Sequence, residues 1–296
     1  MSLPPGASNA RRVGGGDINE AWRVTLAGGR EAFVKTRADA GPDEYATEAR
    51  GLKWLAETGA LRTPRVLEVA EDYLVLEWVQ QGSLSTEGAE QLGRGLALTH
   101  AAGAPAFGAP THGLPGAALA PAHHQVDGEG NPAASTFGSL RLPNDPTPDW
   151  PAFYAQRRLL PLAAIACERG ALSQAGARTV EAVCERLTAL AGPPEPPARL
   201  HGDLWSGNAM AGADGRPWLI DPSAYGGHRE VDLAMLRLFG ASSPRIFAAY
   251  EEAAPLADGW EERVELWQLL PLLVHAVLFG GSYVAAAEQV ARRYAG

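Results

Sequence analysis

The chain has 296 residues, of which 46% are hydrophobic, and a formal net charge of −9 at neutral pH. This length suits two lobes sharing a cleft better than one small domain, and the composition can supply a sizeable core. The acidic balance argues against a general nucleic-acid or anionic-membrane surface, so neither partner is expected. The polar segment 1–12 lacks the apolar stretch of a signal peptide, and no apolar run reaches the length of about 18 residues that spans a membrane.

Residues 13–37 are predicted to form a β-hairpin and a returning strand. A glycine-rich opening is followed by β-forming residues at 22–26, a glycine pair and a second β-forming run at 31–36. In the opening, Gly15 and Gly16 are candidates for backbone N–H contacts to phosphate. Their spacing is not G-x-G-x-x-G, so a flexible turn is the alternative, and no Walker A sequence occurs.

Lys35 closes the second run and is one of only two lysines in the chain, the other being Lys53. The run is similar to the V-A-I-K strand of kinases, where a compact ammonium group contacts the phosphates of ATP. Residues 42–58 have apolar residues at helical spacing and predict an amphipathic helix. Glu48 on this helix is the preferred partner for Lys35, with Glu44 as the competitor.

Two further strands are predicted at 64–69 and 73–79, which would complete a five-stranded N-terminal lobe. The second run is apolar almost to its end. The chain would then pass through a hinge at about 77–82, where backbone groups of Glu77 and Val79 can pair with the adenine edge of ATP.

The rest of the chain is mainly helical by pattern. Helices are predicted at 87–100, at two places within 151–191, from 230 to 238, and over most of 244–295. Residues 101–150 are rich in Pro, Gly and Ala with little periodicity, and so long an irregular stretch is usually mobile or functional. We expect a loop that crosses the cleft.

The segment 201–208, His-Gly-Asp-Leu-Trp-Ser-Gly-Asn, is the most informative part of the chain. Asp203 lies five residues before Asn208, and Asp221 follows thirteen residues later at the end of an apolar strand-like run. This spacing matches the catalytic loop and metal-binding Asp of protein kinases. Asp203 would accept the proton of an attacking hydroxyl, and Asn208 and Asp221 would hold Mg²⁺ on the phosphates of ATP.

Segments 200–208 and 221–235, which include Leu-Trp-Ser-Gly-Asn and His-Arg-Glu-x-Asp-Leu-Ala-Met, resemble the fructosamine/ketosamine kinase family. This family belongs to the wider aminoglycoside-phosphotransferase and choline-kinase group. The resemblance implies an α+β, two-lobed protein-kinase-like fold. Residues 1–80 would form a small antiparallel-sheet lobe that binds the nucleotide, and residues 83–296 a larger, mainly helical lobe for catalysis and substrate.

The resemblance further implies ATP-dependent phosphorylation of the sugar 3-hydroxyl of ketosamines, either small or protein-linked. The product is unstable, so the activity reverses glycation. Asp203 carries over as catalytic base, Asn208 and Asp221 as Mg²⁺ ligands, and Lys35 with Glu48 as the phosphate-anchoring pair. A cytoplasmic monomer is expected.

The sugar site has three candidates, Trp205, His228 and Arg229, each close to the matched motifs. A packed Trp and an ion-paired Arg are the structural alternatives for these positions. Asp232, in the same segment, is expected to brace the catalytic loop.

Two departures from the family bear on substrate and regulation. The family's Asn-Tyr-Ile-Gly segment is replaced here by Thr136-Phe137-Gly138, and Asp17 stands where some relatives carry a cysteine. The first departure leaves the substrate preference open, and the second means that a redox switch is not expected at that loop. Two alternatives stand beside a ketosamine kinase: a kinase for an aminoglycoside or a choline-like acceptor, and an inactive kinase-like binding module. Retention of all four chemical groups, Lys35, Asp203, Asn208 and Asp221, counts against the inactive module.

Overall fold

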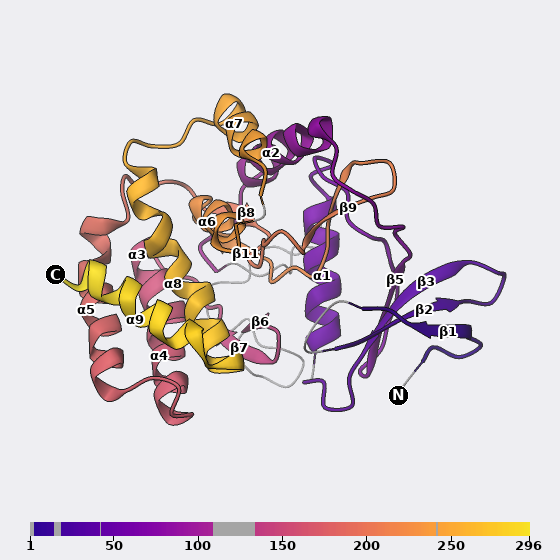
Figure 1. Ribbon diagram of the computed structural model, residues 1–296, viewed down its shortest axis with the longest axis horizontal. Helices are drawn as coiled ribbons and strands as arrows, with labels where there is room; N and C mark the ends of the chain where they lie inside the picture. Colours follow the sequence, from indigo (N-terminus) through magenta and orange to yellow (C-terminus); the bar gives the residue numbers. More distant parts are fainter. Residues whose placement is uncertain (1–2, 15–18, 42, 109–133, 241) are drawn as a thin grey trace.

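The computed structural model of the chain describes residues 3–14, 19–41, 43–108, 134–240 and 242–296. In Figure 1, strands β1 to β5 gather at the right and most of the helices gather at the left. Helix α1 stands between these two groups. The chain therefore has a sheet lobe at its N-terminal end and a helical lobe at its C-terminal end.

The sheet lobe is built on five antiparallel strands in the order β1-β2-β3-β5-β4. The strands are β1 (Ser8–Arg12), β2 (Glu20–Thr25), β3 (Glu31–Thr36), β4 (Val66–Val69) and β5 (Tyr73–Glu77). Five strands were predicted for this lobe and five are present, but only β2 to β5 lie where strands were predicted. Strand β1 was not predicted, because Ser-Asn-Ala-Arg-Arg has no apolar alternation, and it is exposed along its whole length.

Side chains alternate between the two faces of strand β3. Ala32 and Val34 pack into the apolar cluster on one face, whereas Phe33 packs on the other face with residues of α1. Lys35 is two residues after Phe33, so it faces α1 as well. The pleat of this strand therefore directs the lysine toward the helix.

Helix α1 (Glu44–Ala56) covers that face of the sheet and confirms the helix predicted at 42–58. Ala49 and Leu52 are buried against the sheet, as expected for an apolar stripe at helical spacing. Glu48 lies beside this stripe. The helix thus brings a carboxylate to the face of the sheet that carries the lysine.

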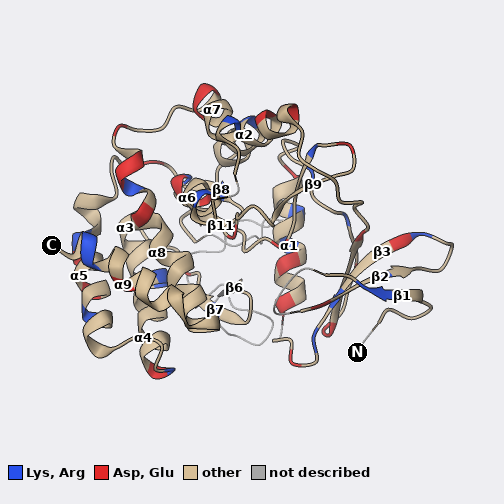
Figure 2. Cartoon of the chain, viewed as in Figure 1, with Lys and Arg blue, Asp and Glu red and all other residues tan. Residues whose placement is uncertain are grey.

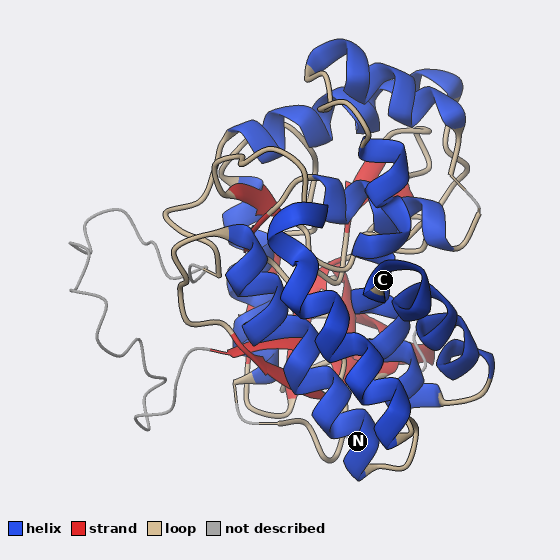
Figure 3. Cartoon of the chain, turned by 90° about the vertical axis from the view of Figure 1, so that its left-hand side faces the viewer, coloured by secondary structure: helices blue, strands red, loops and turns tan. Residues whose placement is uncertain are grey.

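The helical lobe contains the remaining described helices. Figure 3, in which the left-hand side of Figure 1 faces the viewer, shows them in front of the strands. They are α2 (Thr86–Ala101), α3 (Trp150–Phe153), a π-helical turn (Tyr154–Leu159), α4 (Leu160–Glu168), α5 (Gln174–Leu190), α6 (Glu230–Leu238), α7 (Pro244–Ala253), α8 (Trp260–Phe279) and α9 (Ser282–Ala295).

Short antiparallel strand pairs in this lobe bring the motif segments together. The pairs are β6 (Ala134–Phe137) with β7 (Leu140–Pro143), β8 (Ala198–Leu200) with β11 (Tyr225–Gly227), and β9 (Ala209–Ala211) with β10 (Pro217–Leu219). Strand β8 leads into segment 201–208, and β10 ends just before Asp221. The two motifs are therefore adjacent although they are separated in the sequence.

The expectation of an irregular loop over 101–150 needs correction at its C-terminal end. Residues 134–143 form the β6–β7 hairpin, while 109–133 lie outside the described residues. Gly138 has φ of 58° and stands in the two-residue turn between the strands. A glycine at positive φ suits such a turn, and this local signal was missed.

Candidate active site

A cavity of about 600 Å³ lies between the two lobes. Six predicted site residues line it together, and they come from β3, α1 and the two motif segments: Lys35, Glu48, Asp203, Trp205, Asn208 and Asp221. Such convergence of charged and aromatic groups in one cleft is typical of an active site. The cavity is therefore the candidate site.

Lys35 links α1 to the segment that follows β10. Its Nζ lies 2.9 Å from Glu48 Oε2 and 3.0 Å from Asp221 Oδ1, so the predicted contact with Glu48 is present. The competing Glu44 instead pairs with Arg37 at 2.7 Å. Burial by itself lowers the pKa of Lys35, but the Asp221 and Glu48 carboxylates outweigh burial and raise that pKa above its ordinary value. These contacts therefore favour the charged form of the lysine.

Asp203 and Asn208 are fixed to each other within the catalytic segment. The Asn208 amide nitrogen donates to the Asp203 carbonyl oxygen at 2.8 Å and to Asp203 Oδ2 at 3.2 Å. Burial raises the pKa of Asp203 to about 7, and the nearby Asp221 and Asp232 carboxylates add to this effect. A carboxylate with a pKa near neutrality is well suited to accept a proton from a hydroxyl.

Asp232 contacts the backbone at the start of the catalytic segment. Its two carboxylate oxygens accept hydrogen bonds from the backbone N–H groups of His201 at 2.7 Å and Gly202 at 2.9 Å. Oδ2 also contacts His100 Nε2 at 3.2 Å. The contacts expected of a bracing residue are therefore present, and they fix the turn that presents Asp203.

The Asp221 carboxylate and the Asn208 amide oxygen are the kind of ligands that Mg²⁺ prefers, whereas a metal held by protein side chains alone would need more of them. Among the residues that the structure describes, no group of three or more His, Cys, Asp or Glu side chains could hold a metal. Asp221 offers a half-exposed carboxylate, and the Asn208 amide oxygen remains available because its nitrogen is anchored to Asp203. Mg²⁺ is usually held by one or two carboxylates together with substrate phosphates and water.

Aromatic side chains form one wall of the cavity. Trp205 and Phe239 have ring centroids 6.0 Å apart, and His275 lies 5.4 Å from Phe239 and 4.9 Å from Tyr283. Trp205 is 40% exposed and Phe279, which also lines the cavity, is 46% exposed. We call Trp205, Phe239, His275, Phe279 and Tyr283 the aromatic wall.

His275 is held as a neutral ring in this wall. Its Nδ1 lies 2.7 Å from the Pro271 carbonyl oxygen, so Nδ1 carries the proton and donates it, and Nε2 is left as an acceptor. Burial lowers the pKa of His275. Of the wall residues, only Trp205 was predicted from the sequence. The i, i+4 spacing of His275 and Phe279 in α8 is a local signal for a shared helical face, whereas Tyr283 lies in α9, after the break at Gly280 and Gly281.

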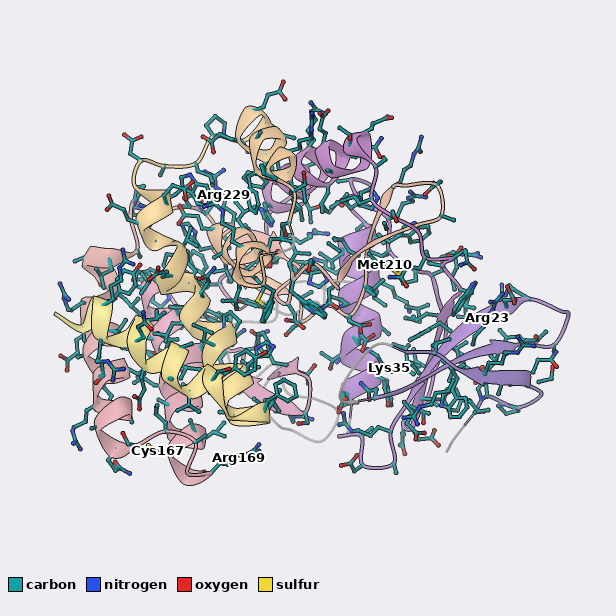
Figure 4. All side chains as sticks on the ribbon, viewed as in Figure 1. Arg23, Lys35, Cys167, Arg169, Met210 and Arg229 are labelled. Atoms are coloured by element: carbon teal, nitrogen blue, oxygen red, sulfur yellow. The ribbon has the colours of Figure 1, made fainter. Side chains whose placement is uncertain are left out.

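His228 and Arg229 are not brought to the cavity, in contrast to Trp205. Figure 4 shows Arg229 well separated from Lys35, among the helices of the helical lobe. Arg229 donates two hydrogen bonds of 2.8 Å to Glu195, and His228 is 3% exposed and stacks on Trp267. The ion-paired alternative therefore describes Arg229, because this segment forms an internal network and not a ligand surface.

Four other residues were predicted to contact the nucleotide, namely Glu77, Val79, Gly15 and Gly16, and the structure describes only the first two of them. The Glu77 side chain is not among the residues that line the cavity, and it pairs with Arg65 at 3.2 Å. After Val79, the backbone is tied to the helical lobe by hydrogen bonds from Ala213 to Gln80 and from Gly82 to Ala211. Backbone pairing of Glu77 and Val79 with adenine stays a prediction. Gly15 and Gly16 lie outside the described residues.

The charges of the described elements are mixed in sign. Figure 2 shows acidic and basic residues interspersed over both lobes. In the part of the chain that the structure describes, no helix combines the length and apolar character needed to cross a membrane.

The fold is that of protein-kinase-like phosphotransferases. A choline kinase from Streptococcus pneumoniae matches it with a TM-score of 0.58, over 98% of this chain and 94% of that structure, at 13% sequence identity. At such low identity the match shows the fold alone. The expected two-lobed α+β kinase-like class is confirmed.

The chain belongs to the fructosamine kinase family, whose model matches residues 4–117 and 111–295. A probable ketoamine kinase of Thermus thermophilus is 37% identical over 272 residues, which is 92% of this chain and 88% of the relative. The crystal structure of a Thermobifida fusca protein provisionally named fructosamine-3-kinase has 40% identity and a TM-score of 0.83, covering 98% and 93% of the two chains.

A third relative, the chloroplastic protein-ribulosamine 3-kinase of rice, is 31% identical over 290 residues, covering 95% of this chain and 77% of the relative. The family and its named members are ATP-dependent phosphotransferases. This chain is therefore an enzyme that uses ATP, and the family resemblance seen in the sequence is confirmed.

We expect Lys35→Met to raise the KM for ATP by about tenfold or more, because a charged hydrogen bond of this kind contributes about 1.5–3 kcal/mol. Lys53→Met is the matched control, since Lys53 is exposed on α1 and should leave KM within about twofold. The measurement is a steady-state titration with ATP. Equal and mild effects of both changes would contradict a phosphate contact for Lys35.

Proposed function

We propose that this enzyme transfers the γ-phosphoryl group of ATP to the sugar 3-hydroxyl of ketosamines such as fructosamines and ribulosamines. The observation that carries the proposal is that Asp203, Asn208, Asp221 and Lys35 line one cavity with an aromatic wall. The class of phosphoryl acceptor is taken from the names of two relatives, a probable ketoamine kinase and a protein-ribulosamine 3-kinase.

The phosphoryl-transfer side of the cavity has one role for each polar group. Lys35 would contact the phosphates, and Asn208 and Asp221 would hold Mg²⁺, which neutralises charge that develops on the phosphate oxygens. Asp203 would accept the proton of the acceptor hydroxyl as its oxygen attacks the γ-phosphorus. The short link between Asp203 and Asn208 supports this assignment, because it fixes base and metal ligand relative to each other.

The aromatic wall would hold the acceptor opposite the phosphates. Ketosamines carry a secondary amine that is protonated at neutral pH, and a cation over an aromatic face is attracted by the ring quadrupole. Neutral His275 adds an acceptor at Nε2 for an N–H or O–H group. Trp205 is two residues from Asp203, so a sugar against its ring would lie close to the base.

Several finer expectations belong to the same proposal. The lobe boundaries remain 1–80 and 83–296, with a hinge at about 77–82 that binds adenine. The acceptor amine would be free or attached to protein, and the enzyme would act as a cytoplasmic monomer. An aminoglycoside or choline-like acceptor is the alternative, which the relatives' names disfavour.

Asp203→Asn should lower the rate of phosphoryl transfer by about 10²-fold or more, because general-base catalysis contributes about 10²–10⁴-fold. The amide keeps the shape of the side chain, so ATP binding should change little. Single-turnover kinetics with saturating ATP measures the step directly. Transfer at near the unaltered rate would rule out Asp203 as the base.

Fructosyl- and ribulosyl-amines should be phosphorylated faster than choline, homoserine or aminoglycosides when each is offered with MgATP. An ADP-release assay across this panel, followed by location of the phosphate on the product, tests both acceptor and position. Preference for another acceptor would reject the ketosamine proposal while leaving the kinase assignment intact.

Trp205→Ala should raise the KM for the ketosamine by about tenfold, because an aromatic face over a cation contributes about 0.5–2 kcal/mol. The KM for ATP should stay within about twofold. Trp54→Ala is not a suitable control because Trp54 is buried, whereas exposed Leu98→Ala in α2 removes a large side chain away from the cavity. An unchanged acceptor KM would exclude Trp205 from the sugar site.

A further inference from the structure

Asp221 has an unusual backbone conformation. Its φ is 53°, in the left-handed region that residues other than Gly seldom adopt, although Asp does so more often than most. Such a conformation persists only when the surrounding structure holds it in place. The contacts around this residue therefore need an explanation.

One side of helix α1 rests on the segment that begins with Asp221. A Cβ atom placed on Gly51 would lie 3.3 Å from Pro222 Cγ and 3.3 Å from Ala224 Cβ, so the helix backbone packs closely on this segment and leaves no room for a larger side chain without a shift of the neighbours. Glu48 is three residues earlier, on the same side of the helix. It reaches Asp221 through Lys35, with links of 2.9 and 3.0 Å.

The last turn of α1 is fastened to the strand that leads into the catalytic segment. Arg199 of β8 donates a 2.6 Å hydrogen bond from Nη1 to the Trp54 carbonyl oxygen, and its guanidinium lies 4.5 Å from the centre of the Trp54 ring. The same Nη1 contacts Glu57 at 3.2 Å. Because β8 pairs with β11, this strand pair borders both motif segments.

We propose that Gly51 and Arg199 are positioning residues for the metal and nucleotide site, and that they act by seating α1 on the Asp221 segment. The inference deepens the proposed function, because it rests on Asp221 being a Mg²⁺ ligand. In protein kinases the equivalent Lys–Glu pair depends on movement of a helix. Here the contacts of Gly51 with Pro222 and Ala224, and of Arg199 with Trp54, fix α1 against the helical lobe; we call these contacts the seat of α1. The Lys35–Glu48 pair is therefore already formed in the folded protein.

The alternative is that Gly51 only allows close packing and contributes to stability alone. Gly51→Val adds bulk directly against Pro222 and Ala224, whereas Ala56→Val adds a β-branched side chain at an exposed position of the same helix. Both changes therefore introduce a valine into the same helix, and only Gly51→Val disturbs the seat of α1.

The experiment measures binding of Mg²⁺ with a non-hydrolysable ATP analogue by titration calorimetry, without any acceptor, alongside thermal unfolding. Gly51→Val should raise the Kd of the Mg²⁺–nucleotide complex by about tenfold, in line with losses seen when residues that orient metal ligands are changed. Ala56→Val should leave Kd within about twofold. A folded Gly51→Val protein with a lowered Tm and an unchanged Kd would overturn the proposal.

A second variant covers the case in which Gly51→Val does not fold. Arg199→Lys keeps the charge but loses the planar guanidinium that lies over the Trp54 ring and the contacts of its Nη1 with the Trp54 carbonyl oxygen and Glu57. It should raise the same Kd by about threefold or more, and an unchanged Kd would overturn the proposal. Because no acceptor is present, failure of the ketosamine assignment would appear only in the acceptor panel and leave this result unaffected.

Discussion

The contact of buried Lys35 with largely buried Glu48 and half-exposed Asp221 is the interaction on which the arrangement of the site depends. It joins a strand of the sheet lobe, helix α1 and the segment after β10 through links of 2.9 and 3.0 Å. Breaking a buried ion pair leaves an uncompensated charge, which is strongly unfavourable. The alternation of β3 and the apolar stripe of α1 therefore serve one purpose, which is to keep an ammonium group between two carboxylates.

The site gathers more negative than positive charge around this contact. Burial, together with the Asp221 carboxylate, raises the pKa of both Glu48 and Asp203 to about 7, and the Lys35 ammonium opposes this effect. A divalent cation relieves such repulsion and changes the local protonation equilibria. This charge balance is a physical reason why the proposed chemistry combines Asp221 with Mg²⁺ and leaves Asp203 available as a base.

The segment after β11 illustrates how neighbouring residues in one motif take different roles. Asp232 holds the backbone of the catalytic turn, whereas Glu230 accepts hydrogen bonds from Arg263 and Trp267 in the core. Arg229 is bound to Glu195. These contacts make the motif a framework for the site. The proposed acceptor side is instead the aromatic wall, which comes from the C-terminal end of α6, from α8 and α9, and from the catalytic segment.

The sequence by itself determined strands β2 to β5, helix α1 and six of the residues that line the cavity, because strand alternation, helical spacing and the Asp203–Asn208–Asp221 interval are local patterns. The kinase-like fold followed from the resemblance of its motifs to a known family. Gly138 was a local turn signal that went unused. Only the tertiary structure separated Trp205, which lines the cavity, from His228 and Arg229, which do not. Proximity in sequence does not fix the direction of a side chain, and packing of distant helices decided which groups face the cavity.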